Sequence, residues 1–325
     1  EKETVQTKAQ GVAHLLTTPD HKFWARTAGT RPSEPKRGMV KAEPEWIEAR
    51  NLDRCYVNAK LPAEEETDLT HEQWWIVGRY LADGHVGTRG DYFISVGKSK
   101  QHEFELCAGE YAGTRADRGS CFQYRLKGLP ENMKTMLAKC GRGAENKQVP
   151  VEGLCLPKDY AESLLCGYLS GDGNTTGNET SATSVSRGLL LGIAMLVQRV
   201  HGKTPSIFAG KSGGKNMIEG REVNTKQEWV LSWRDGKHCR NVMLDDGAWK
   251  RVKHIVPTGV KTVWSIRVAD DASYTAEGCI VKNCPLQFDT VDRLINRYSN
   301  PDDLVFDPFG GVGTVPLRAM KLGRR

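Results

Sequence analysis

The feature that most constrains the fold of this chain is a weak internal repeat. The segments Gly78–Gly84 and Gly167–Gly173 both consist of a glycine, three residues, a small residue, an aspartate and a glycine, and each closes an apolar segment of helical pattern. Small residues four positions apart share one face of a helix, so two such helices can approach each other backbone to backbone. The repeat therefore predicts two packed helices that end at Asp83 and Asp172.

The two aspartates are the first candidates for a functional site. If the helices pack in parallel, their C-terminal ends meet, and two carboxylates at the negative ends of two helix dipoles repel each other. A divalent cation relieves that repulsion, and oxygen ligands favour Mg²⁺, which supports phosphodiester hydrolysis. The alternative is that each Asp-Gly pair is only a helix C-terminal turn. For a single copy we would favour that alternative by about three to one, but two matching copies favour the site.

Further helices and strands are expected around the repeat. Thr70 is positioned to cap the first helix, and alternating apolar and polar residues mark the strands. The expected helices cover residues 74–82, 131–140, 160–171 and 187–201, and the expected strands cover residues 92–96, 121–126 and 228–233.

Both ends of the chain show a different pattern. Residues 1–62 and the segment from about residue 249 to 283 contain short alternating runs with Gly and Pro punctuation, which are typical of strands. The acidic segment 63–68 marks a boundary after the first of them. Strands are expected within 11–23, at 252–256 and 263–268, and on both sides of Glu277-Gly278. The pattern predicts a β-rich unit that is split by an α/β insertion.

The pair Asn283-Cys284 follows the last of these strands. The side-chain amide of an asparagine can attack its own backbone carbonyl, which closes a succinimide and cuts the chain, and the thiol of a cysteine can accept an acyl group. An Asn-Cys pair alone usually marks a turn. The apolar strand before it and the unrelated motif after it favour the interpretation that the chain changes identity between Asn283 and Cys284.

The two helical motifs resemble those of the LAGLIDADG (DOD) homing endonucleases, in a single chain with two pseudo-symmetric halves. The resemblance implies an α/β saddle that lays its strands into the major groove of double-stranded DNA, with Asp83 and Asp172 as the acids that hold Mg²⁺. It also implies a monomer and a basic residue near the metals. Lys147 is our preferred candidate, with Lys98 and Lys203 as others, although any one of them is more often a solvated lysine. Strand residues that contact phosphates, or that simply face outward, are Tyr124, Arg125, Lys127, Trp229, Trp233 and Arg234.

An endonuclease inserted into a β-rich unit that ends in Asn-Cys resembles an intein, whose splicing part is a horseshoe-like, all-β Hint domain. Thr18 and His21 match the internal Thr-x-x-His motif, which implies that they activate the upstream scissile bond. Asn283 would cyclise, and Cys284 would be the downstream nucleophile. The histidine expected before the terminal asparagine is Lys282, and lysine is a poor proton donor near pH 7.

Two more departures from the intein pattern bear on splicing. Ala272 stands where a second histidine is often found, and no Cys or Ser opens the first strand near Glu1. We therefore expect that an upstream intein and N-extein segment is missing and that this chain does not complete splicing alone.

Residues after the junction resemble a DNA amino-methyltransferase. An expected strand at 304–306 leads into a glycine-rich loop at 307–314 and then a helix, an arrangement that lets a backbone approach a nucleotide-like ligand. The resemblance implies S-adenosylmethionine as the cofactor of the intact host enzyme. The catalytic Asp/Asn-Pro-Pro-aromatic motif is absent, so this fragment is not expected to methylate by itself. The cofactor-binding candidates in the loop are Asp307, Phe309, Gly310, Gly311 and Gly313.

Composition excludes several classes of protein. No apolar run among the 325 residues approaches the length of a membrane span, so no membrane partner is expected. The nine cysteines include no Cys-x-x-Cys pair, which argues against a zinc site or a disulfide framework. Reduced thiols and the resemblances predict a cytoplasmic location in a bacterial, archaeal or phage-infected cell. A net charge of +6 permits contact with nucleic acid but does not require it.

The sequence thus predicts an α+β chain in four parts. These are the N-terminal part of the split Hint domain at 1–62, a two-repeat endonuclease at 67–240, the C-terminal part of the Hint domain at 247–283, and a C-terminal α/β methyltransferase fragment at 284–325. Two alternatives stay open: a DNA-binding insertion that no longer cleaves, and an inert insertion in a methyltransferase.

Overall fold

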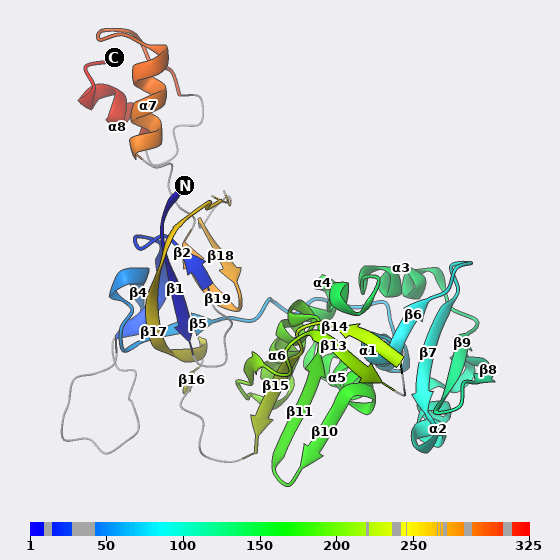
Figure 1. Ribbon diagram of the computed structural model, residues 1–325. Coiled ribbons are helices and arrows are strands. Elements are labelled where there is room, and N and C mark those ends of the chain that lie inside the picture. The colour runs from blue at the N-terminus through cyan, green and yellow to red at the C-terminus, as the bar shows by residue number, and fades with distance from the viewer. Residues whose placement is uncertain are drawn as a thin grey trace, which may run out of the picture.

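The computed structural model describes most of the chain (Figure 1). The structure shows a mixed arrangement of helices and sheets, as the sequence predicts. Within the described residues, no helix is long and apolar enough to cross a membrane. The described residues are 1–9, 15–27, 43–218, 221–235, 242–244, 246–264, 266, 268, 272–282, 288–307 and 314–325.

Strands from both ends of the chain form one sheet, in the order β18-β19-β3-β5-β17-β1-β2, with β16 beside β17 and β4 beside β3. In Figure 1 the N-terminal strand β1 therefore lies against β17, although about 250 residues separate them in the sequence. The core of this unit is apolar and includes Phe23, Val57 and Val281. Its strands are β1 (Lys2–Ala9), β2 (Leu15–Thr17), β3 (Lys22–Thr27), β4 (Glu45–Glu48), β5 (Cys55–Ala59), β16 (Val242–Leu244), β17 (Gly247–Lys261), β18 (Ser273–Ala276) and β19 (Cys279–Lys282).

The expected strands at the ends of the chain are confirmed in part. The hairpin around Glu277-Gly278 forms, and both turn residues have positive φ, 51° and 74°. The strand expected at 252–256 is part of the 15-residue β17. The strand expected at 263–268 is wrong for its described residues: Trp264 and Ile266 lie outside any strand and are exposed, because no neighbouring strand covers them.

The middle of the chain folds as two halves with the same topology. Each half has a central helix, followed by a hairpin, a second helix and two more strands. The second of these strands inserts beside the hairpin. The sheet orders are accordingly β6-β7-β9-β8 and β10-β11-β15-β12. The second half adds a separate hairpin of β13 (Gly214–Ile218) and β14 (Arg221–Thr225) before its last strand.

The boundaries of the expected helices and strands agree closely with the structure. Thr70 caps the first helix through a reciprocal pair of hydrogen bonds with Gln73. The first half contains α1 (His71–Asp83), β6 (Gly84–Val86), β7 (Tyr92–Gly97), α2 (Gln101–Ala108), β8 (Ala112–Asp117), β9 (Cys121–Leu126) and α3 (Glu131–Lys139). The second half contains α4 (Val151–Leu154), α5 (Lys158–Asp172), β10 (Gly173–Thr176), β11 (Glu179–Ser184), α6 (Arg187–His201), β12 (Ser206–Ala209) and β15 (Trp229–Arg234).

The helices α1 and α5 pack in parallel at the centre of this unit, with one sheet on each side (Figure 1). A Cβ atom placed on Gly78 would lie 2.0 Å from the carbonyl oxygen of Leu164, and one on Gly167 would lie 1.9 Å from that of Trp75. Only glycine allows such an approach, because any side chain would overlap the opposite backbone. The prediction of two helices in backbone contact is confirmed.

The glycines that follow the two aspartates do not adopt the left-handed conformation that often ends a helix. Gly84 has φ −84° and Gly173 has φ −75°, both in the extended region. Each residue instead lies against the last turn of its own helix. A Cβ on Gly84 would lie 2.1 Å from the ring of Tyr80, and one on Gly173 would lie 2.4 Å from the carbonyl oxygen of Leu169. Both positions require glycine, because a Cβ atom would overlap the last turn of the helix. The chain continues from each helix directly into a strand, β6 or β10.

The C-terminal segment contains α7 (Phe288–Tyr298) and α8 (Thr314–Lys321), which pack through Val291, Ile295 and Ala319. The strand expected at 304–306 does not form, so that prediction is wrong. The backbone here bonds to the last residues of the chain: the amide of Val305 donates to the carbonyl of Arg325 at 2.7 Å, and the amide of Arg325 donates to that of Asp303 at 2.9 Å. These few bonds do not extend into a strand in the described residues.

The glycine contact predicts a specific loss of stability. We expect Gly78→Ala to lower the free energy of unfolding by about 1–3 kcal/mol, because the added Cβ collides with the backbone of α5. Urea denaturation of both forms measures this difference. Gly97→Ala is the matched control, since a Cβ there meets nothing within 4 Å and the local φ of −56° suits alanine. Equal losses in the two variants would contradict the close packing of α1 and α5.

Candidate functional site

The structure brings Asp83 and Asp172 together as the last residues of two parallel helices. A Cβ on Gly171 would lie 2.9 Å from the Oδ2 atom of Asp83, so the carboxylate of the first helix lies over the last turn of the second. Burial and the charge of Asp83 raise the pKa of Asp172 to about 6, against the opposing effect of nearby cations. The two aspartates therefore form a pair in which like charges interact.

The two carboxylates have different neighbours. Nη1 of Arg79 lies 2.6 Å from Oδ2 of Asp83, four residues along the same helix, and the guanidinium is almost fully buried. The corresponding residue of the second helix is Tyr168, which is also buried and whose hydroxyl has no hydrogen-bond partner among the described residues. Sequence analysis did not single out either residue, although the repeat alignment places both one turn before the aspartates.

Two lysines bind the C-terminal carbonyls of the helix pair. Lys147 donates to the carbonyl oxygens of Tyr80 and Ala82 at the end of α1, at 2.8 and 3.1 Å. Lys100 donates to those of Ser170 and Gly171 at the end of α5, at 2.6 and 2.9 Å. Each helix end, whose last carbonyls lack helical partners, thus receives one ammonium group.

The prediction for Lys147 agrees with this geometry, and Lys100 was missed. Burial lowers the pKa of Lys147, while the charges of Asp172 and Asp83 act in the opposite direction. Lys98 contacts Asp117 at 2.9 Å and Lys203 lies 3.7 Å from Asp235, so both candidates point away from the acid pair. The short turn that contains Lys98 and Lys100 aims them at different partners, and no pattern in the sequence indicates which of the two reaches α5.

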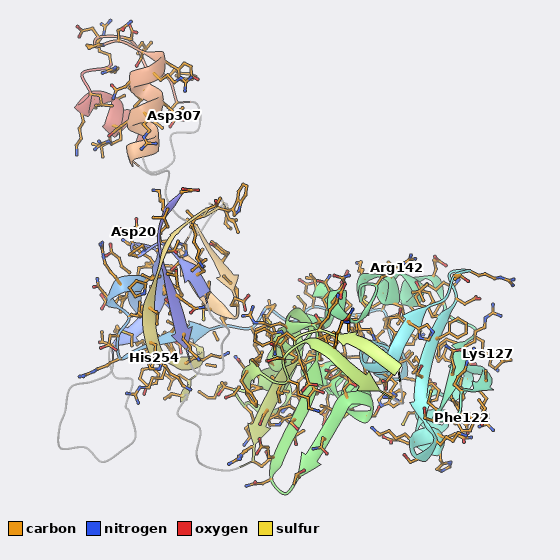
Figure 2. The ribbon with its side chains drawn as sticks, in the orientation of Figure 1. Asp20, Phe122, Lys127, Arg142, His254 and Asp307 are labelled. Atoms are coloured by element: carbon orange, nitrogen blue, oxygen red, sulfur yellow. The ribbon has the colours of Figure 1, made fainter. Side chains whose placement is uncertain are left out.

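The outer faces of the two sheets carry a row of polar side chains. On the first sheet, His85 stacks on Phe93 and lies 3.0 Å from Gln123, and Arg125 pairs with Asp91 at 2.7 Å. Figure 2 shows Phe122 and Lys127 at the edge of this sheet formed by β8 and β9. On the second sheet, Arg234 pairs with Glu179.

Two of the proposed phosphate contacts are corrected by burial. Tyr124 and Trp233 point into the core with Ile94 and Leu231, because strand residues alternate between the two faces of a sheet. The hydroxyl of Tyr124 donates to Glu105 at 2.6 Å, so it is already bonded. These aromatic residues are core residues of the unit and do not belong to an exposed surface.

The splicing candidates lie in the other unit. Thr18 and His21 are both buried in a turn between β2 and β3, in which the amide of His21 donates to the carbonyl of Thr18 at 3.1 Å. Burial lowers the pKa of His21, although the charge of Asp20 opposes this shift. Figure 2 shows Asp20 in this unit, on the side of the turn.

The last described strand of the unit leads toward this turn. Val281 of β19 pairs with Phe23 of β3, so Lys282 lies next to the start of β3, and its ammonium group is 5.5 Å from the ring centre of Trp46. Asn283 and Cys284 lie outside the described residues. Their positions relative to Thr18 and His21 therefore stay predictions.

Of the five candidate residues in the proposed S-adenosylmethionine loop, the structure describes one. Asp307 lies with α7 and α8 in Figure 2, and Phe309, Gly310, Gly311 and Gly313 lie outside the described residues. The part of the chain that the structure describes contains no group of three or more His, Cys, Asp or Glu side chains that could hold a metal ion. Any metal at the helix pair would therefore depend on two carboxylates and on other oxygen ligands.

Comparison with known proteins finds one partial match to a family model and several similar structures. Residues 203–325 match a family model for DNA methylases of the N6_N4_Mtase type. That range includes the predicted fragment at 284–325 and also extends over the strands that precede it. The chain is 25% identical over 162 residues to the DNA-directed RNA polymerase subunit Rpo1C of Methanocaldococcus jannaschii, which covers 46% of this chain and only 18% of that protein.

The solved structures that resemble this chain include the homing endonuclease I-DmoI. A variant in complex with its target DNA in the presence of Mg is 12% identical and covers 50% of this chain and 88% of its own, with a TM-score of 0.32. The complex with DNA and Ca is 11% identical and covers 50% and 82%, with the same TM-score. A likeness of this size does not assign an activity to the chain.

The raised pKa of Asp172 predicts that the stability of the folded chain depends on pH. The pKa of Asp172 in the folded chain, about 6, lies above its ordinary value of 3.8, so the folded state holds the proton more tightly than the unfolded state. Stability therefore falls as pH rises between these values. We expect Asp172→Asn, which cannot ionise, to be more stable than the wild type at pH 8 by up to about 3 kcal/mol, with little gain at pH 4.

Thermal melts in EDTA at the two pH values measure this gain. The exposed Asp53, in the other unit, provides the control variant Asp53→Asn, which is expected to change stability little at either pH. A gain for Asp172→Asn that is the same at pH 4 and pH 8 would contradict the charge interaction.

Proposed function

We propose that this chain is an intein fragment that carries a site-specific DNA endonuclease, followed by the start of a DNA methyltransferase. The observation that carries the endonuclease proposal is the parallel packing of α1 and α5, which ends both helices on an aspartate at one place. The methylase family match supports the identity of the C-terminal part. Double-stranded DNA is the proposed substrate, and a cytoplasmic location follows from such a role.

The acid pair has the properties of a divalent cation site. Two carboxylates whose charges interact lie beside a buried hydroxyl without a bonding partner in the described chain, and the nearby cations offset burial and repulsion at Asp172 only in part, since its pKa stays raised. Asp83 and Asp172 would hold Mg²⁺, which would supply Lewis-acid stabilisation of charge on a phosphodiester. Lys147 and Lys100 donate hydrogen bonds to the last carbonyl groups of α1 and α5, and so help to fix the two helix ends that carry the carboxylates.

The outer faces of the two sheets are the proposed DNA-binding surface. Both sheets follow directly from the aspartates through β6 and β10, so DNA bound across the sheets would bring a phosphodiester to the acid pair. His85, Gln123, Arg125 and Arg234 provide hydrogen-bonding and charged groups on these faces. Base contacts in a major groove require donors and acceptors of this kind.

The splicing proposal rests on the arrangement of the other unit. Thr18 and His21 lie in a buried turn, and β19 pairs with β3 close to this turn. Asn283 is proposed to cyclise and Cys284 to accept the acyl group, with Thr18 and His21 acting on an upstream bond. Lys282 contacts an aromatic ring and is not proposed as the proton donor.

The second candidate function is DNA binding without cleavage. The ion pair between Arg79 and Asp83 favours it, because a buried guanidinium reduces the net negative charge that would attract a metal. Both candidates share the same surface and the same acid pair. They differ in whether the bound DNA is cut in the presence of Mg²⁺.

Selection from a randomised duplex library distinguishes the two candidates. The intact chain is incubated with Mg²⁺, and cut ends are sequenced. We expect a defined cut site, and we expect Asp83→Asn or Asp172→Asn to lower cleavage at least 100-fold without unfolding the chain, because each removes one ligand of the metal. Asp53→Asn is the control, as it changes an exposed carboxylate in the other unit. Enrichment of a bound sequence without cutting would support the second candidate, and full activity of either site variant would contradict the metal assignment.

Mass spectrometry of the purified chain tests the cleavage step of splicing. We expect slow release of residues 284–325 if Asn283 cyclises, and no release from Asn283→Ala, which cannot form a succinimide. Gln287→Ala, downstream of the junction, is a control that leaves the reacting residues unchanged. An unchanged mass after long incubation would contradict cleavage by this chain alone.

A further inference from the structure

The two halves of the helix pair differ at one buried position. The aspartate of the first helix has Arg79 one turn before it, whereas the aspartate of the second helix has Tyr168. Arg79 is 2% exposed and Tyr168 is fully buried, so both side chains lie inside the helix pair. The difference places a permanent positive charge next to one carboxylate and a neutral phenol next to the other.

The guanidinium of Arg79 lies at the interface of the two helices. A Cβ on Gly171 would lie 2.0 Å from its Nη1 atom, 2.4 Å from Cβ of Ala82 and 2.9 Å from Oδ2 of Asp83. The glycine thus leaves room for the charged group over the end of α5. The missing side chain at Gly171 allows Arg79 to reach Asp83 on the side that faces Asp172.

Arg79 makes few other polar contacts. Its Nη2 donates to the carbonyl of Ser95 at 3.4 Å, and its Nη1 lies 2.6 Å from Asp83 without an aligned hydrogen bond in the described part of the chain. A guanidinium has five N–H groups, so a purely structural role would normally satisfy more of them. Its principal interaction is the charge of Asp83.

We propose that Arg79 is a built-in counter-ion that occupies the cation position beside Asp83. The helix pair then binds one divalent cation, on the Asp172 side, whereas a pair with the same neutral residue in both halves would bind two. This inference rests on the proposed metal site at the acid pair. At the matching position of the second helix, Tyr168 supplies no charge, and its hydroxyl has no hydrogen-bond partner among the described residues. The guanidinium also weakens the binding of that one cation, because like charges at this distance repel in a partly buried site.

Manganese binding to the intact chain tests the inference without relying on cleavage. Metal-free protein is titrated with Mn²⁺, and free Mn²⁺ is measured by electron paramagnetic resonance. Ions that also bind to Asp172→Asn are subtracted as unrelated to the site. We expect one weakly bound ion for the wild type. For Arg79→Met we expect a second ion, or at least tenfold tighter binding of the first.

Two further variants test whether the effect depends on the positive charge of Arg79 and on its position beside Asp83. Arg79→Lys keeps the charge and should bind Mn²⁺ as the wild type does. Arg26→Met removes an arginine that also pairs with an aspartate, Asp246 at 2.7 Å, but in the β-rich unit, and should leave binding unchanged. If thermal melts show that Arg79→Met does not fold, Arg79→Gln replaces it, because glutamine can still hydrogen-bond to Asp83.

The outcomes distinguish this inference from the proposed function. Identical binding by the wild type and the neutral Arg79 variants, with loss of binding in Asp172→Asn, overturns the counter-ion role and leaves the metal site intact. Equal tightening in Arg26→Met also overturns it, since the effect would then depend only on net charge. Equal binding by the wild type, the Arg79 variants and Asp172→Asn overturns the metal site itself.

Discussion

The contact between the backbones of α1 and α5 is the interaction on which the rest of the central unit depends. Gly78 and Gly167 allow the two helices to touch, and this contact sets the distance between the two sheets and the position of both aspartates. The large apolar core that surrounds the helices includes residues from both halves. A side chain at either glycine would separate the halves and the acid pair together.

The same contact brings negative charges together at the site, where they repel each other. Helices that pack in parallel bring two C-terminal ends together, where partial negative charges and two carboxylates add up. Three positive side chains offset this charge: Lys147 and Lys100 each bind one helix end, and Arg79 pairs with Asp83. Each helix end receives one lysine, whereas the arginine has no counterpart, because Tyr168 occupies its position in the second helix. The charge beside the two aspartates therefore differs at this position of the repeat.

The β-rich unit and the central unit are joined by specific contacts as well as by the chain. Arg187, at the start of α6, pairs with Glu277 in the hairpin turn at 2.7 Å, and Gln198 donates to the carbonyl of Ala59 at 3.0 Å. The turn that leads into β19 is thus held by the central unit.

The sequence by itself determined the helices, most of the strands, and the close contact of two helices that end on aspartates, because these depend on local periodicity and on the spacing of small residues. The strands expected at 263–268 and 304–306 do not form at their described residues, which have no strand beside them in the described part of the chain. Only the tertiary structure decided that Lys100 reaches α5, that Tyr124 faces the core, and that the guanidinium of Arg79 lies over the end of α5. Those outcomes depend on which side chains meet across distant segments, and spacing along one chain does not contain that information.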